Sequence, residues 1–412
     1  MVSMETAEKE KDMASKNNTL IDGELGIPIF TREEGQRRWK KIRELMMQRQ
    51  IDCLLICGST FNYRSGYGDI RYISNACPYT DDAFVVFPLQ GDPILYVWSR
   101  SSQYWAEKVS WMPVAFSQWT PQGNTYPRLM ADKIKDLGLE KGTLGIVDEF
   151  SWLVYAYERL KALLPRAKLV DAGEILRTVR LIKNPGELEY VRKAGKCADK
   201  GWEALKNTAK HGVSQNDLIA ALESAMARNG AEVATMNLLG VKQWPDGWGF
   251  PFGSSDRKLK KGDIINCEIT PSYGGYYAQL VRPISLGTPP DDFYAQLEID
   301  RAMYRMAVKE MRPGNVAQEI SDKISNWAMK RGRPFSFASP CFQMLDNMTR
   351  TPLYMGELQP GMVFMVHPMT YPPEPQLEKR QGHGGHLIGD TYIITASEPE
   401  PLSHLPFDVA IV

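Results

Sequence analysis

The sequence lacks the features that mark several special classes of protein. It has no run of about 18 apolar residues that could span a bilayer, and residues 1–18 lack the apolar segment of a signal peptide. Lys and Arg balance Asp and Glu at 49 each, so no basic surplus points to nucleic acid or to an anionic membrane. The six cysteines are scattered and form no Cys-x-x-Cys pair, which favours reduced, mostly buried thiols. We therefore expect a cytoplasmic protein without a nucleic-acid or membrane partner.

The composition is that of an ordinary globular protein. Hydrophobic residues make up 43% and charged residues 24% of the 412 residues, a length that favours two or three domains. Residues 1–20 are polar and predict a flexible tail. From residue 21 onward, apolar runs typical of buried strands, such as IDCLLICGS (51–59), alternate with segments of helical apolar spacing, such as 31–50. This alternation predicts a compact α/β domain over residues 21–175.

The pattern changes near residues 176–190, and a second domain is expected over residues 176–412. The stretch NPGE (184–187) is typical of a helix start, because proline fits the first helical turn. Further long helical segments, apolar strands and a hairpin with adjacent glycines follow. Strands and helices in this mixed order predict an α+β domain.

Four segments, in this order and spacing, resemble the creatinase/prolidase/methionine aminopeptidase family. They are LRTVRLIKNPGELEYVRKA (176–194), KKGDIINCEITPSYGGYYAQLVR (260–282), LQPGMVFMVHPM (358–369) and GDTYIITAS (389–397). The resemblance covers about residues 30–410, and it is nearest to creatinase-like members. It implies an α/β N-terminal domain followed by an α+β catalytic domain with the pita-bread fold.

The resemblance also bears on metal binding. The metallo-members of this family hold two cations with two Asp, one His and two Glu, since carboxylates suit hard divalent cations. The corresponding positions here are Glu268, Gln279, Cys341, His367 and Gly389. One carboxylate does not hold two cations, so the resemblance implies no dinuclear metal centre and no cofactor. A single zinc ion on His367, His383 and Glu268 stays open as an alternative.

Four residues are candidates for catalytic proton transfer, namely Glu268, His367, His383 and His386. A carboxylate at the expected position of Glu268, on the pocket floor, is costly unless it is paired or functional. The plainer alternative is an ion pair between Glu268 and Arg282 or a lysine. Histidine titrates near neutral pH and suits acid and base work, whereas the plainer alternative for the histidines is a solvated turn. If Glu268 and His367 line one cavity, they form a coupled pair that shares a proton.

Seven residues are candidates for substrate binding. By resemblance, Arg350 holds a substrate carboxylate in a bidentate fork, and FNYRSGYGD (61–69) closes the pocket of the partner in a homodimer. Trp248 belongs to an aromatic loop that either cages a quaternary-ammonium group or forms a packed lid. Cys341 is either a small buried hydrophobe or a nucleophile. The full set is Arg350, Arg64, Tyr63, Gln279, Trp248, Tyr277 and Cys341.

Three functions remain open from the sequence. The first is metal-independent hydrolysis of a C–N bond in a small carboxylate-bearing substrate, in the manner of creatinase. The second is a lyase that performs β-elimination, C–C cleavage or decarboxylation on a small organic acid, such as dimethylsulfoniopropionate or an aromatic acid. The third is a pita-bread protein that binds a partner without catalysis. Creatinase uses a loop histidine as its base, and the corresponding loop here, residues 244–263, contains no histidine.

Overall fold

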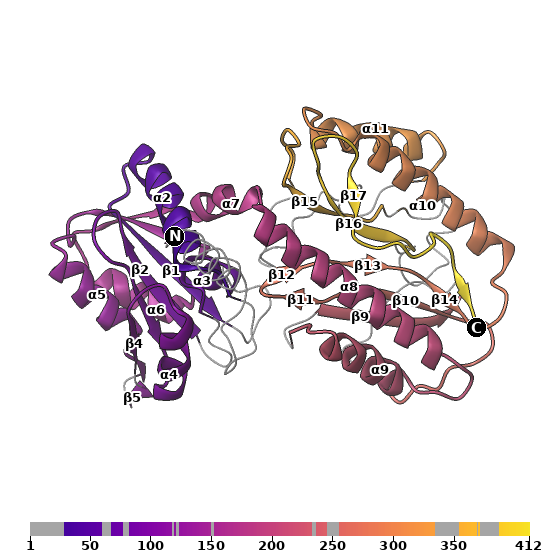
Figure 1. Cartoon of the computed structure of the whole chain (residues 1–412), viewed down its shortest axis with the longest axis horizontal. Coiled ribbons are helices and arrows are strands. Elements are labelled where there is room, and N and C mark those ends of the chain that lie inside the picture. The colour runs from indigo at the N-terminus through magenta and orange to yellow at the C-terminus, as the bar shows by residue number, and fades with distance from the viewer. Residues whose placement is uncertain are drawn as a thin grey trace, which may run out of the picture. The chain divides into compact units, whose positions relative to one another are not determined.

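The computed structural model describes residues 29–59, 67–76, 82–117, 119–120, 123–149, 152–232, 236–244, 255–333, 354–368, 370 and 387–412. They divide into two compact units, one that ends at Arg180 and one that begins at Leu181 (Figure 1). The domain boundary expected after residue 175 lies within helix α7 (Gly173–Leu181). No helix of these ranges is long and apolar enough to cross a membrane.

The N-terminal unit is built on a six-stranded sheet with the order β4-β3-β2-β1-β7-β8. Strand β1 runs parallel to β7, and β7 runs parallel to β8, whereas β2 is antiparallel to β1 and β3. Between β4 and β7 in the sequence, two short strands form a separate two-stranded sheet. The strands are β1 (Cys53–Ser59), β2 (Asp82–Pro88), β3 (Ile94–Val97), β4 (Val114–Phe116), β7 (Thr143–Val147) and β8 (Lys168–Asp171), and the two-stranded sheet is β5 (Trp119–Thr120) with β6 (Gly123–Asn124).

Helices cover both faces of this sheet, which confirms the predicted α/β architecture. The helices are α2 (Arg32–Gln48), α3 (Tyr67–Ser74), α4 (Arg100–Val109), α5 (Tyr126–Asp136), α6 (Val154–Leu163) and α7. On β1, Leu54 and Ile56 pack with residues of α2, α3 and α7, whereas Leu55 and Cys57 pack with residues of α5 and α6. A strand buried on both faces is apolar throughout, which explains the continuous run in the sequence.

One buried cation stands out on helix α2 of this unit. Arg38 is only 1% exposed. Its Nε donates to Glu34 Oε1 at 2.8 Å, and its Nη1 donates to the Tyr72 carbonyl at 3.0 Å. The guanidinium also lies over the rings of Phe30 and Tyr72, 4.4 and 4.1 Å from their centroids. Arg38 therefore joins α2 to α3 through a charge that is fully paired and stacked.

The C-terminal unit contains an eight-stranded sheet. Its path is β15-β16-β13-β10-β14-β18, with β9 paired to β10 and β17 paired to β16. The strands are β9 (Met236–Gln243), β10 (Asp263–Thr270), β13 (Leu280–Val281), β14 (Ile284–Ser285), β15 (Val363–Val366), β16 (Gly389–Ile393), β17 (Glu400–Pro401) and β18 (Ala410–Ile411). A separate hairpin consists of β11 (Ser272–Tyr273) and β12 (Tyr276–Tyr277), and its turn residues Gly274 and Gly275 have φ of 61° and 83°. Two successive positive φ values at such a two-residue turn favour glycine.

Four helices pack on this sheet in two pairs (Figure 1). They are α8 (Pro185–Thr208), α9 (Gln215–Arg228), α10 (Asp291–Glu310) and α11 (Ala317–Met329). The start predicted at NPGE is confirmed, because Asn184 and Glu187 form a reciprocal capping box at the beginning of α8. Residues of α8 and α9 cluster with β10, whereas residues of α10 and α11 cluster with β15 and β16. The mixed α+β architecture is thus as predicted.

Candidate active site

Strand β10 separates an apolar face from a polar face. Ile265, Cys267 and Ile269 pack into the apolar cluster beneath α8 and α9. Side chains alternate along a strand, so Glu268 and its neighbours two residues away point to the opposite face. These side chains are polar but buried: Glu268 is only 8% exposed, and Asn266 and Thr270 are buried as well. A buried polar row on a sheet whose other face is apolar marks this face as the candidate site.

Glu268 contacts the side-chain amide of Gln279. Gln279 Nε2 donates to Thr270 Oγ1 at 2.9 Å and lies 3.4 Å from Glu268 Oε2. The amide must present its nitrogen to the carboxylate, because its oxygen would repel the negative charge. Gln279 Oε1 is consequently turned away, and this buried acceptor has no hydrogen-bond partner among the described residues. Such an acceptor is suited to a bound N–H group.

Asn266 extends this polar face by one more position. It is 1% exposed, and both polar atoms of its amide are buried without a hydrogen-bond partner in the described part of the chain. The sequence reasoning missed Asn266. The available signal was its spacing, two residues before Glu268 on a predicted strand, which places both side chains on one face. Asn266 and Gln279 together offer donors and acceptors beside the carboxylate.

The strand register brings Glu268 and His367 onto one row of the sheet. Glu268 pairs with Val281, and Val281 pairs with Gly389. Gly389 in turn lies beside His367, which directly follows β15. Three strand spacings place the Cα atoms of Glu268 and His367 about 14 Å apart. The hypothesis that these two groups share a proton stays a prediction.

Gly389 makes room for His367. A Cβ atom at Gly389 would lie 2.6 Å from His367 Cβ, 2.5 Å from Met365 Cε and 3.2 Å from the Val366 carbonyl oxygen. Contacts below 3 Å are far inside van der Waals distance, so even alanine does not fit without movement. The side chain of His367 thus occupies the space into which a larger residue at 389 would project.

The described residues do not fit a pair of metal ions. Four of the five positions that hold metal ligands in the family lie among the described residues. Here Glu268 supplies a carboxylate, Gln279 a neutral amide, His367 an imidazole, and Gly389 no side chain. The amide nitrogen of Gln279, rather than an oxygen, faces Glu268. Within the described ranges, no group of three or more His, Cys, Asp or Glu side chains converges in a way that could hold a metal ion.

Behind Gly389, the opposite face of the sheet carries a buried charged network. Arg282, which is 0% exposed, donates to Asp390 Oδ2 at 2.8 Å and to the Gly389 carbonyl at 3.1 Å. Tyr304 donates to the same carboxylate oxygen at 2.9 Å and lies 2.6 Å from the Tyr392 hydroxyl. Burial raises the pKa of Asp390 to about 6 despite the nearby guanidinium, and burial also raises the pKa of Tyr392 to about 12.

This network corrects one sequence interpretation. Arg282 was the plainer partner for Glu268, but it pairs with Asp390 instead. The sequence reasoning missed Asp390 and Tyr304. An arginine and an aspartate inside otherwise apolar strands were the available signal, because buried charges need opposite charges nearby. The network ties β13 to β16 and so holds Gly389 in place next to His367.

The remaining predicted site residues fall into two groups. Tyr277 is 7% exposed and pairs with Ser272 in the β11–β12 hairpin, while its neighbour Tyr276 donates to Glu187 at 2.7 Å. The other candidates lie outside the described residues, namely His383, His386, Arg350, Arg64, Tyr63, Trp248 and Cys341.

The mixed sheet with two helix pairs packed on it is the architecture of the pita-bread fold. The model of Metallopeptidase family M24 matches residues 189–396, and that of the Creatinase/Prolidase N-terminal domain matches residues 38–182. The chain therefore belongs to the creatinase/prolidase group of family M24 and is a creatinase-like hydrolase. The resemblance stated from the sequence is confirmed.

Two curated relatives align along nearly the whole chain. Creatinase from Bacillus sp. (strain B-0618) is 23% identical over 93% of this chain and 94% of its own length. Ectoine hydrolase from Halomonas elongata is 24% identical over 93% of this chain and 98% of its own length. Among solved structures, X-Pro aminopeptidase from Thermotoga maritima has a TM-score of 0.74 at 18% identity, covering 91% of this chain and 99% of that protein. The structural likeness confirms the fold.

Proposed function

We propose that this protein hydrolyses a C–N bond of a small carboxylate-bearing molecule without using a metal ion. The observation that supports this most is the buried carboxylate of Glu268 beside the amide of Gln279. In this arrangement Glu268 is the general base. It takes a proton from water, the water oxygen bonds to the substrate carbon, the C–N bond breaks, and the leaving nitrogen takes the proton from Glu268.

The substrate class rests on the amides and on the relatives. Gln279 Oε1 is a buried acceptor without a partner among the described residues, and it accepts the N–H of the substrate in our proposal. A creatinase, an ectoine hydrolase and a Xaa-Pro dipeptidase are similar along most of the chain. His367 contacts the far end of the bound molecule, because about 14 Å of sheet separates it from Glu268.

Metal independence rests on the donor set. Replacing a carboxylate by the amide of Gln279 removes a negative ligand, and Gly389 leaves no side chain at a fourth position. A neutral amide and an imidazole beside one carboxylate are too few charged ligands for two hard cations. Activity should therefore survive dialysis against a chelator, and elemental analysis should find no stoichiometric divalent metal. Loss of activity on chelation, restored by one metal, would refute this part of the proposal.

The test of the reaction is a screen of small carboxylates with a C–N bond, including ectoine and Xaa-Pro dipeptides, followed by NMR. Reaction in heavy-oxygen water should place the label in a product, because hydrolysis adds water across the bond. An unlabelled elimination product would favour the lyase alternative instead.

Once a substrate is known, Glu268→Gln should lower turnover by about 10²–10⁴-fold, the usual range for a general acid or base. His367→Ala should also lower kcat/KM. The exposed variant Glu223→Gln on α9 is the matched control and should turn over like the wild type. If Glu268→Gln keeps wild-type turnover, Glu268 is not the base.

The same proposal includes a homodimer, in which Tyr63 and Arg64 of one chain complete the partner's pocket. Light scattering should give twice the mass of the chain. Mixing an Arg64→Ala variant with a Glu268→Gln variant should restore part of the activity, because mixed dimers then contain one intact site. A fully active monomer would contradict this arrangement.

A further inference from the structure

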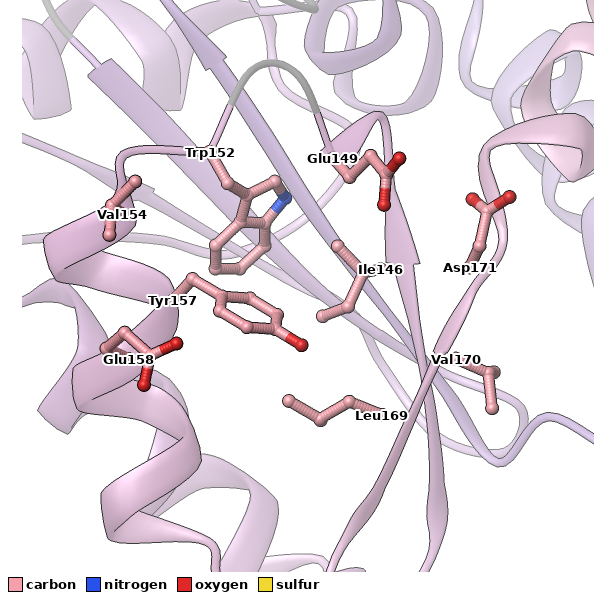
Figure 2. A pocket seen from close by; sticks show the side chains of 9 residues that line it. All are labelled: Ile146, Glu149, Trp152, Val154, Tyr157, Glu158, Leu169, Val170 and Asp171. Carbon is pink, nitrogen blue, oxygen red and sulfur yellow. The ribbon is translucent and has the colours of Figure 1, made fainter.

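A cleft in the N-terminal unit lies far along the chain from the polar face of β10. It has a volume of about 440 Å³ and is formed within one strand–helix–strand segment, β7–α6–β8 (Figure 2). Its lining residues are Ile146, Glu149, Trp152, Val154, Tyr157, Glu158, Leu169, Val170 and Asp171. Two of its lining residues, Glu149 and Asp171, lie at the carboxyl ends of the parallel strands β7 and β8. Its volume is within the range of small-molecule sites.

The charged side chains that line this cleft are all acidic. Glu149 follows β7, Asp171 ends β8, and Glu158 lies on α6, so three elements contribute one carboxylate each (Figure 2). None of the three forms an ion pair with another residue in the described part of the chain, and no Lys or Arg lines the cleft. Asp171 Oδ1 accepts a hydrogen bond from the backbone N–H of Gly173 at 3.0 Å, which orients this side chain. The guanidinium of Arg177 lies near the same carboxylate, because both groups approach Gly173, so the charge of Asp171 is partly compensated. The carboxylates of Glu149 and Glu158 favour a cationic ligand.

Two aromatic rings form one wall of the cleft. Trp152 and Tyr157 lie on the α6 side, opposite Leu169 and Val170 of β8 (Figure 2). The Trp152 indole N–H donates to the Val147 carbonyl at 3.2 Å, which fixes the ring against the end of β7. Aromatic faces attract cations through their quadrupole and, unlike carboxylates, also bind alkyl groups attached to the charge.

A second feature of the same loop is its backbone. Asp148, between β7 and Glu149, has a φ of 52°, in the left-handed region that non-glycine residues rarely adopt. Residues held in such conformations occur preferentially at binding and active sites. The conformation turns the chain at the end of β7, so that Glu149 and Trp152 both line the cleft.

The side chains that line the cleft favour an organic cation over a metal ion. The described carboxylates do not converge into a group that could hold a metal ion. They surround an apolar and aromatic interior, which suits a larger cation with alkyl groups. We propose that this cleft of the N-terminal unit is a binding site for a small organic ammonium ion, and this proposal does not depend on the proposed function.

The test uses choline and butylammonium as probes, with 3,3-dimethylbutan-1-ol as the neutral isostere of choline. Isothermal titration calorimetry of the full chain should show binding of at least one ammonium probe, and weaker binding as salt is raised, because exposed carboxylates are screened. The neutral isostere should bind at least about ten-fold more weakly, since both Coulomb attraction and the cation–π contact are absent. Failure of both ammonium probes, or equal binding of the isostere, overturns the proposal.

Variants then assign the binding to this cleft. Tyr157→Leu keeps an apolar side chain and should weaken ammonium binding by about two- to thirty-fold. Glu149→Gln with Glu158→Gln should weaken it further and remove most of the salt dependence. Glu140→Gln changes a partly exposed carboxylate of the same unit that pairs with Arg166 and does not line the cleft. It is the matched control and should bind like the wild type.

The melting temperature of each variant separates loss of the site from loss of the fold. Unchanged binding in the Tyr157 and double glutamate variants, with folding retained, would show that the probes bind elsewhere, and the proposal would then fail.

Discussion

The substitution Gly389→Ala adds one methyl group at a position where the neighbouring strand leaves no space for it. The added Cβ would lie 2.6 Å from His367 Cβ and 2.5 Å from Met365 Cε. Met365 Cε is the end of a flexible side chain and moves at little cost. His367 Cβ is fixed to the backbone, so relief of that contact requires β15 and β16 to separate.

The expected cost follows from two opposing effects. Overpacking of a close contact costs about 1–3 kcal/mol. Alanine also restricts the unfolded chain more than glycine does, which contributes about 0.4–1 kcal/mol in the other direction. We therefore expect Gly389→Ala to lower the free energy of unfolding by about 1–2 kcal/mol. For a unit of this size, that corresponds to a fall in Tm of about 2–4 °C per kcal/mol.

A double-mutant cycle tests the assignment to His367. In a His367→Gly background the contacting Cβ is absent, so Gly389→Ala should be neutral or slightly stabilising. In a His367→Ala background the Cβ remains, and the cost should persist. The difference between the two backgrounds should be about 1–3 kcal/mol, the usual coupling for residues in contact. Urea denaturation, followed by the transition of the C-terminal unit, measures each free energy.

An equal cost of Gly389→Ala in the two backgrounds would refute this reasoning. If Gly389→Ala costs the same in the glycine and alanine backgrounds, His367 Cβ is not the limiting contact. If Gly389→Ala is as stable as the wild type, the strands β15 and β16 have room for a larger residue. The argument for metal independence rests on the donor set and would not change.

Two further predictions concern buried charges. Burial raises the pKa of Asp390 to about 6 in the folded protein, from 3.8, so between these pH values the folded state holds a proton that the unfolded chain releases. As pH rises from about 4 to about 6, the free energy of unfolding of the wild type should therefore fall by up to about 3 kcal/mol relative to that of Asp390→Asn. Chemical denaturation at a series of pH values measures this difference, and the absence of such a slope would contradict the raised pKa of Asp390. Arg38→Met should destabilise the N-terminal unit by about 3 kcal/mol, because it leaves Glu34 with one cationic partner fewer and removes the stacked guanidinium. The half-exposed Arg37→Met is its control, and an equal effect of the two variants in chemical denaturation would be evidence against a special role of Arg38.

Local sequence patterns predicted much of the fold and part of the candidate site. The apolar run at β1 predicted a strand buried on both faces, and Asn184 with Glu187 marked the start of α8, since both signals depend only on residues close in the chain. Resemblance to a family then identified the fold class and singled out Glu268 and Gln279, which the structure places in contact.

The tertiary structure alone decided which residues meet. Arg282 pairs with Asp390, 108 residues away, because β13 lies next to β16 in the sheet, and strand alternation predicts only the face of a side chain, not its partner on another strand. The same register placed Gly389 beside His367 and separated His367 from Glu268 by three strand spacings. The carboxylates of Glu149 and Asp171 likewise share a cleft only because β7 and β8 run parallel and end at one edge.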